Sequence, residues 1–292
     1  MSDYSMAVQD IDTLVHLLDD PDAVVYDAVA SRFLEQGTGT IPHLEKVWAH
    51  SRDANIRERI EAIIRQIHLQ DALQGMQQWI GGQQHNLLEG AYWIAKQHYP
   101  NLRLPQLQNA IDDILKDIWV ATSDETLPIL NKLNIFNHLF YRTHLYTHTA
   151  ETLNPAYCFI NRVLETKCGN NVSLGLLYLH LAQQAGFPMY GVCLPGAFLL
   201  AYTNTSGKVV CYVNPFRNGI WAGKQEVTNY LQQRGFTCRP EYYTPCDNVT
   251  VILRLAEYIV FAYERGNNMP QADIYRAFLP LFGNRITNFI ED

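Results

Sequence analysis

Residues 153–216 carry the pattern of a helix followed by three strands, a layout in which cysteine chemistry could be arranged. Such chemistry needs a thiol at the helix start, an imidazole on the next strand, and an Asp or Asn after the strand that follows. The position expected for the imidazole is occupied by Ala197, within Leu194–Leu199. Because the imidazole takes the proton from the thiol, its loss removes the general base. The segment therefore indicates an enzyme-like arrangement that lacks a central catalytic group.

Cys168 is the candidate nucleophile nearest to the predicted helix start. It precedes Gly169, and the positive charge of its neighbour Lys167 could lower the pKa of the thiol. It lies nearly one helical turn before the expected position, and a His would have to come from elsewhere in the fold. The alternative interpretation is a partly exposed loop cysteine without a catalytic role.

Three histidines, His138, His144 and His148, form a second candidate site. On a helix, His144 and His148 would share one face at a spacing that occurs in zinc sites. No neighbouring Glu completes an HExxH motif. The alternative is that these are surface or groove residues, and we predict no metal and no other cofactor.

Hydrophobic periodicity predicts helices on both sides of a small sheet. In the clearest helix, residues 172–185, apolar residues recur at i, i+3, i+4, i+7, i+8 and i+11, and Asn170, Asn171 or Ser173 can cap its start. Strands are expected at 190–194, 198–202 and 209–213, with a hairpin turn between the last two. Further helices are expected at 23–34, 41–49, 56–67, 87–95, 107–118, 125–133, 155–165, 249–264 and 272–282. We therefore predict an α+β fold in which a mostly antiparallel sheet packs on the helix at 172–185.

Composition excludes several classes of function. The chain has 292 residues and a net charge of −7, and it has no cluster of Lys and Arg, so we predict neither nucleic-acid nor anionic-membrane binding. No apolar run approaches the roughly 20 residues of a membrane span, and Met1–Tyr4 lacks the features of a signal peptide. The six cysteines form no CxxC pair, which argues against a disulfide scaffold and a Cys-rich zinc site. We expect a cytoplasmic protein.

The middle of the chain resembles the SirB family of bacterial transglutaminase-like proteins. The order and spacing of six segments carry the resemblance: Leu88–Ala95, Leu133–Asn137, Leu153–Glu165, Val172–Leu179, Gly191–Gly196 and Asn214–Phe216. The resemblance implies a helical N-terminal part, a transglutaminase-like (papain-like) α+β core and, often, tetratricopeptide-like helices at the C-terminus. It implies no defined reaction.

The resemblance also assigns the three catalytic positions. The nucleophile position is Asn171, or alternatively Asn170, at the helix start, where the helix dipole would lower the pKa of a thiol. The family commonly shows Pro-Gly-His-Phe where this chain has Ala197, and Asp-Pro-Phe where it has Asn214. All three positions thus depart from a Cys-His-Asp triad.

Three regions are expected along the chain. Residues 1–82 form a helical region whose helix pair resembles a HEAT-type hairpin, and Gly81-Gly82 marks its end. Residues 83–245 form the transglutaminase-like domain, and residues 246–292 form a tetratricopeptide-like helical hairpin.

The leading functional hypothesis is a catalytically degenerate protein that binds a protein or peptide partner in a regulatory or scaffold role. The predicted binding cleft consists of Gly169, Asn170, Asn171, Gly196, Ala197, Asn214 and Arg217. One alternative is a cysteine hydrolase or acyltransferase that uses Cys168 with a base foreign to the family. A second alternative is a helical-repeat scaffold in which the core serves only as a spacer.

Overall fold

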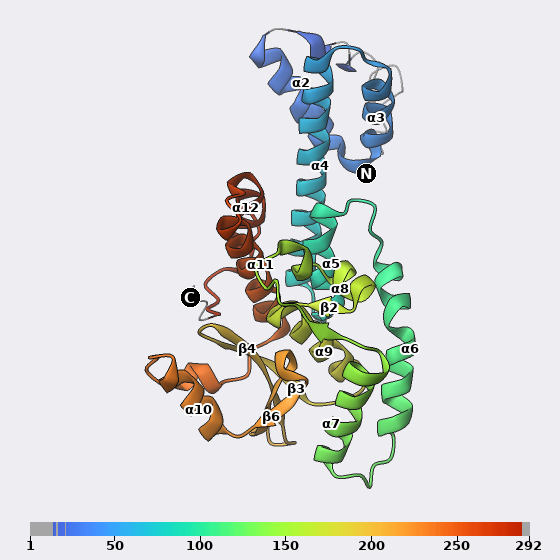
Figure 1. Cartoon of the computed structure of the whole chain (residues 1–292). Coiled ribbons are helices and arrows are strands. Elements are labelled where there is room, and N and C mark those ends of the chain that lie inside the picture. Colours follow the sequence, from blue (N-terminus) through green and yellow to red (C-terminus); the bar gives the residue numbers. More distant parts are fainter. Residues whose placement is uncertain (1–13, 16, 21, 288–292) are drawn as a thin grey trace. The chain divides into compact units, whose positions relative to one another are not determined.

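A computed structural model describes residues 14, 15, 17–20 and 22–287 (Figure 1). The expectation about Met1–Tyr4 therefore lies outside the described residues. The chain divides into two compact units, residues 1–75 and 76–292. The units are described separately below.

The first unit is a small helical assembly with its own core. It contains η1 (Leu17–Asp19), α2 (Ala23–Gln36), η2 (Gly37–Thr40), α3 (Ile41–His50) and the larger part of α4 (Ala54–Gly81). The Asp22 side chain caps α2 by accepting a hydrogen bond from the Val24 amide at 2.9 Å. Apolar side chains from these helices, with Phe33 fully buried among them, form a core separate from that of the second unit.

The second unit is built around α9 (Asn171–Gln184). Every residue from Val172 to Ala182 is buried, as expected of a helix that is apolar on all sides. The α-helices α5 (Leu87–His98), α8 (Ile160–Thr166) and α11 (Asn248–Arg265) pack against it. The unit also contains α6 (Leu104–Thr122), α7 (Ile129–His138), the π-helix η3 (Leu139–Thr143), α10 (Lys224–Gln233) and α12 (Met269–Arg276). Short 3-10 helices, η4 (Pro155–Cys158), η5 (Pro215–Arg217), η6 (Pro240–Tyr243) and η7 (Leu279–Phe282), lie between them.

The sheet of the second unit has four antiparallel strands in chain order. These are β3 (Met189–Leu194), β4 (Ala197–Thr203), β5 (Val209–Asn214) and β6 (Ile220–Ala222). A separate parallel pair joins β1 (Thr147–His148) to β2 (Cys168–Gly169). The predicted α+β class and the antiparallel sheet packed on α9 are thus confirmed.

Side chains alternate between the two faces of the sheet, and each face has its own covering. Phe198 points to α9, where the absence of a side chain at Gly175 leaves room for its ring. On the other face, Val192, Leu199 and Tyr212 pack with α10 and η6 through Val227, Leu231 and Tyr242. Figure 1 shows α10 beside β6, at the end of the sheet remote from α6.

The structure differs from the predicted elements at several places. The helix expected at 125–133 is α7, which begins at Ile129 and ends at His138, and the two-residue strands β1 and β2 were not predicted. The helix expected at 155–165 is interrupted at Phe159, whose backbone is extended and whose ring stacks on His98 with centroids 5.1 Å apart. The helix expected at 272–282 is α12 followed by η7, which has Pro280 in its first turn. The pattern did not predict β6, which is only three residues long, or α10, which is mostly polar.

Candidate functional site

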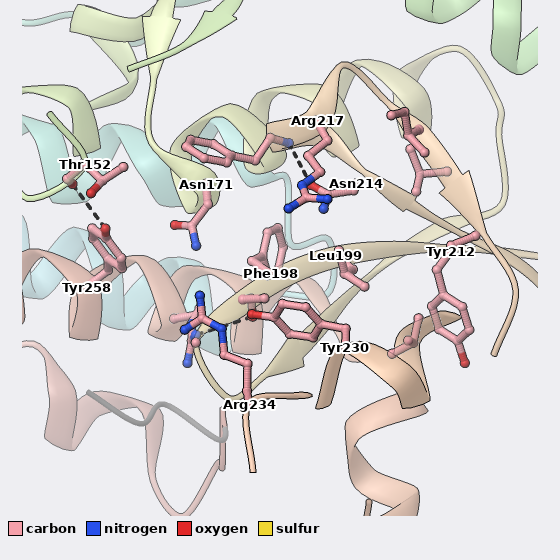
Figure 2. Close-up of a pocket in the computed structure, with 18 of the residues that line it drawn as sticks. Thr152, Asn171, Phe198, Leu199, Tyr212, Asn214, Arg217, Tyr230, Arg234 and Tyr258 are labelled. Atoms are coloured by element: carbon pink, nitrogen blue, oxygen red, sulfur yellow. Dashed lines mark hydrogen bonds between the residues drawn. The ribbon is translucent and has the colours of Figure 1, made fainter. Parts of the chain in front are cut away.

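A cavity of about 740 Å³ opens where the start of α9 meets one end of the sheet. Asn171, Gly196, Ala197, Asn214 and Arg217 all line it. The structure therefore brings together five of the seven residues of the predicted cleft, including all three catalytic positions. Figure 2 shows the Asn171 amide pointing into the space between Tyr258 and Phe198, with Asn214 and Arg217 beyond it.

Asn171 is held at the edge of this cavity by the cap of α9. The Asn170 side chain accepts hydrogen bonds from the amides of Val172 at 3.0 Å and Ser173 at 2.9 Å, while the Ser173 hydroxyl accepts one from the Asn170 amide. This reciprocal capping fixes the first turn of the helix. The Asn171 side-chain oxygen is shielded from solvent and has no hydrogen-bond partner in the described part of the chain.

The turn that carries Gly196 and Ala197 is held by a buried arginine. Arg254 of α11 is 1% exposed, and it donates to the Leu194 carbonyl at 3.1 Å and the Ala197 carbonyl at 3.4 Å. Gly196 has φ +64°, a left-handed conformation that favours glycine. Burial lowers the pKa of the Arg254 guanidinium, but its ordinary value is so high that the group stays charged.

Asn214 begins a tight loop that is supported from α7 and η3. Its side-chain oxygen accepts from the Phe216 amide at 3.0 Å, so this oxygen serves the turn. Tyr141 donates to the Pro215 carbonyl at 2.7 Å, and Asn137 donates to the Gly219 carbonyl at 2.9 Å. Side chains of α7 and of the aromatic-rich segment after it therefore hold in place the loop that begins at Asn214, the third catalytic position.

Gly169 and Asn170 were also predicted in the cleft, but neither lines the cavity. Asn170 is fully buried because its side chain caps α9 and donates to the Cys158 sulfur at 3.0 Å. Gly169 is buried in β2, where a Cβ would lie 2.8 Å from the Ser173 hydroxyl oxygen. Both residues hold the start of α9 in place.

Cys168 does not have the properties of an activated nucleophile. It lies in β2 and does not line the cavity. Burial raises the pKa of its thiol, with hydrogen bonds to Thr149 and Gly169 opposing the rise. The expected effect of Lys167 was wrong, because its ammonium group donates to the Tyr146 hydroxyl at 3.0 Å and lies over that ring.

The three histidines are not arranged as the helical spacing suggested. His138 ends α7, His144 follows the π-helix, and His148 lies in β1, so His144 and His148 share no helix face. His144 instead lies 2.8 Å from the Asp117 carboxylate, and the His148 ring packs edge-on against Phe216. Within the described residues no three His, Cys, Asp or Glu side chains are grouped as metal ligands.

Sequence reasoning missed three arginines that line the cavity. Arg234 comes from α10, and Arg254 and Arg265 come from α11. A signal for one of them was present, since Arg254 interrupts an otherwise apolar run between Val251 and Ala256. A charged residue is rarely buried without a specific role. Arg234 and Arg265 lie at exposed helix ends and carry no comparable signal.

The remaining walls of the cavity are mainly aromatic and aliphatic. Tyr258 donates to the Thr152 carbonyl at 3.1 Å, and burial raises the pKa of its hydroxyl to about 12. At the rim, Leu153, Ile220 and Trp221 are 45%, 62% and 47% exposed. The cavity thus combines apolar surface with a few polar groups, as ligand sites commonly do.

Comparison with known proteins agrees with this geometry. The sequence model of the transglutaminase-like superfamily matches residues 105–257, more than half of the chain. The chain therefore belongs to that superfamily, as a protein with a transglutaminase-like domain. No solved structure matches it significantly.

The curated relatives are bacterial and carry the name UPF0162 protein. The chain is 30% identical to one from Vibrio cholerae over 171 residues, which are 58% of this chain and 63% of that protein. It is 26% identical to one from Xylella fastidiosa over 192 residues, which are 64% and 68% of the two chains. The match thus covers less than two thirds of the V. cholerae relative.

None of the helices formed by the described residues is long and apolar enough to cross a bilayer.

Proposed function

We propose that this protein binds a segment of a partner protein or peptide in the cavity at the start of α9, and does not use Cys-His-Asp catalysis. One observation carries the proposal. Asn171, Ala197 and Asn214 line a common cavity, and no described residue that lines it is Cys or His. The site therefore has the position of a transglutaminase-like active site but different functional groups.

The side chains at these three positions suit binding better than bond cleavage. A carboxamide is not a nucleophile at neutral pH, and the methyl group of Ala197 cannot accept a proton. The Asn214 oxygen is used by the turn at Phe216. What remains is a hollow with hydrogen-bonding groups and exposed apolar side chains at its rim.

The size of the cavity supports a peptide segment as the occupant. Ligand sites commonly enclose about 300–1,000 Å³, and the volume here, about 740 Å³, lies in that range. The exposed side chains of Leu153, Ile220 and Trp221 extend the apolar surface beyond the cavity. A chain longer than the cavity could therefore continue over this rim.

The test is selection of a random peptide library on the full chain. We expect enriched peptides to bind Ala197→Trp at least about tenfold more weakly, a loss of about 1.4 kcal/mol, because the indole fills the cavity. Leu153→Trp at the exposed rim is a second blocking variant that does not depend on repacking the sheet. The control is Ala110→Trp, at an exposed position of α6 outside the cavity.

Two results would contradict the proposal. One is that no peptide is enriched on the unaltered chain. The other is that the enriched peptides bind both blocking variants as tightly as they bind the control.

The proposal also covers the family within the transglutaminase-like superfamily to which the chain belongs. We place it with the SirB-type proteins, on the order of the segments quoted above. The antiparallel pair α11 and α12 is the part that would correspond to tetratricopeptide-like helices. A cytoplasmic location is part of the same proposal.

A further inference from the structure

The last strand of the sheet, β6, has an open edge. β5 is its only neighbour in the sheet that the described residues form, and the side chains of Ile220 and Trp221 are exposed. The strand contains neither proline nor a charged residue, which commonly keep sheet edges from pairing. The first charged residue after it, Lys224, has its ammonium group over the Tyr243 ring, 4.8 Å from the centroid. β6 therefore presents an unprotected edge.

The pairing of β5 with β6 determines which backbone groups face outward. Opposite residues of an antiparallel pair alternate between those that exchange both backbone hydrogen bonds and those that exchange none. If Asn214 and Ile220 exchanged none, the bond beside them would need the N–H of Pro215, which proline lacks. Asn214 and Ile220 therefore exchange both bonds, and the next pair, Val213 and Trp221, exchanges none. The N–H and C=O of Trp221 thus point away from β5.

These outward groups are available to a ligand. Among the described residues, none forms a hydrogen bond with the backbone N–H or C=O of Trp221. Two positions further along the extended chain, the N–H of Gly223 also has no partner in the described structure, whereas its C=O accepts from Val227. At the other end, the Gly219 C=O accepts from the Asn137 side chain. The open edge therefore offers a donor, an acceptor and a second donor in a row.

This edge is continuous with the cavity, because all three residues of β6 line it. A row of alternating donors and acceptors complements an extended main chain, as in recognition by strand addition. A second copy of this chain is a poor occupant, because β6 would contribute only its three residues, whereas specific interfaces use about 20–30 residues a side. An extended peptide, in contrast, can pair with β6 and also follow the cavity.

From these observations we infer that the partner segment binds as an extended strand added to the free edge of β6. It runs antiparallel to β6, so that one of its residues exchanges both backbone hydrogen bonds with Trp221. The partner residue two positions earlier accepts from the N–H of Gly223. The side chain of the exchanging residue lies beside the indole, which favours a β-branched or aromatic residue there. This inference rests on the proposed function and specifies how its ligand docks.

The first test is an N-methyl scan of a synthetic peptide from the set enriched on the full chain. Each variant peptide has one amide hydrogen replaced by a methyl group. We expect a loss of about tenfold or more in affinity at the residue opposite Trp221, because its N–H can no longer donate to the Trp221 C=O. Methylation of the two adjacent residues should have little effect, since their N–H groups point away from β6.

The second test compares Trp221→Pro with Trp221→Val. Both substitutions remove the indole from the cavity wall, but only proline removes the outward N–H. Proline is tolerated on an edge strand where the N–H faces solvent, so no bond to β5 is lost. We expect the proline variant to bind the peptide about tenfold more weakly than the valine variant. The N-methyl scan leaves the protein unaltered, so it decides the question even if the proline variant folds poorly.

The outcomes separate this inference from the proposed function. Equal effects of methylation at adjacent residues, with equal affinity of the proline and valine variants, would overturn strand addition. If the same peptides still lost binding on Ala197→Trp and Leu153→Trp, the peptide-binding cavity would stand. A dimer of the full chain that Trp221→Pro dissociates in analytical ultracentrifugation would assign the edge to a second copy and also overturn the inference. If no peptide is enriched, both the inference and the proposed function fail.

Discussion

His180 is a titratable side chain buried in the middle of α9. It is 2% exposed, and its Nδ1 atom has no hydrogen-bond partner in the described part of the molecule. Burial lowers the pKa of the imidazole from 6.5 to about 4, because the charged form would lose its hydration. The folded protein therefore keeps this residue neutral at pH values where the unfolded chain binds a proton.

This difference predicts a loss of stability in mild acid. Between pH 6.5 and about 4 the unfolded state binds the proton more readily, so the free energy of unfolding falls as the pH falls through that window. The slope contributed by His180 is at most about 1.4 kcal/mol per pH unit. In His180→Gln the decline measured by urea denaturation should be shallower, whereas the exposed control His50→Gln should behave like the parent. Identical slopes for His180→Gln and the parent would contradict the prediction.

At the residue scale, the sequence predicted best those site residues that lie next to recognisable helices and strands along the chain. Asn171, Ala197 and Asn214 were assigned through the resemblance to the SirB family, whose motifs fix their places at the helix start and beside the strands, and all three line one cavity in the structure. Arg234 and Arg265 reach the same cavity only because α10 and α11 pack against the sheet. That packing depends on tertiary contacts distant in sequence, so neither residue could be assigned to the cavity from the sequence.

At the scale of elements, the contact of α9 with the sheet depends on a glycine. A Cβ at Gly175 would lie 2.7 Å from Cδ1 and 2.9 Å from Cε1 of Phe198. Such distances are too short for carbon atoms in contact, so a methyl group would push the helix and β4 apart. This close approach of α9 to Phe198 explains why glycine occupies position 175 within a buried helix. Phe198 also lines the cavity.

Gly175→Ala is therefore expected to destabilise the protein, although alanine usually favours a helix. The expected cost is about 1–3 kcal/mol, typical of overpacking in a core. The control is Gly81→Ala at the end of α4, where a Cβ would meet no atom within 4 Å and should be neutral or slightly stabilising. Urea unfolding followed by circular dichroism measures both changes. A stabilising effect of Gly175→Ala would contradict this prediction, because it would show that β4 can move away from α9 without loss of folding free energy.

The helices and strands with the longest runs of regularly spaced apolar residues were predicted most accurately. The helices α9 and α11 have long apolar stripes, and both were predicted within a few residues of their ends. The break at Phe159 was not, because it results from the stacking of that ring on His98, more than 60 positions away. The strand β6 was missed because Ile220–Ala222 is short, and only its pairing with β5 defines it.

At the scale of the whole molecule, all described residues that line the cavity come from the second unit. The first unit has its own core, in which Phe33 is 0% exposed. Damage to that core should therefore lower the stability of one unit and leave the site intact.

Phe33→Ala provides the corresponding prediction. Removing this buried ring should destabilise the first unit by about 3–5 kcal/mol, seen by calorimetry as a transition at lower temperature. The affinity for the peptides selected above should be unchanged. Phe136→Ala is the comparison, because Phe136 packs on Tyr178 with ring centroids 4.3 Å apart and belongs to the helix that supports the Asn214 loop. An equal loss of affinity in both variants would show that the site depends on the first unit.

The buried Arg254 bears on how tightly the cavity would hold the proposed ligand. Its guanidinium joins α11 to the turn before β4 and to the backbone of Thr287 near the C-terminal end of the described residues. This wall of the cavity is thus already ordered before a ligand arrives. A ligand that uses it does not have to supply the entropy of fixing that loop. Weak individual contacts can then suffice for selective binding.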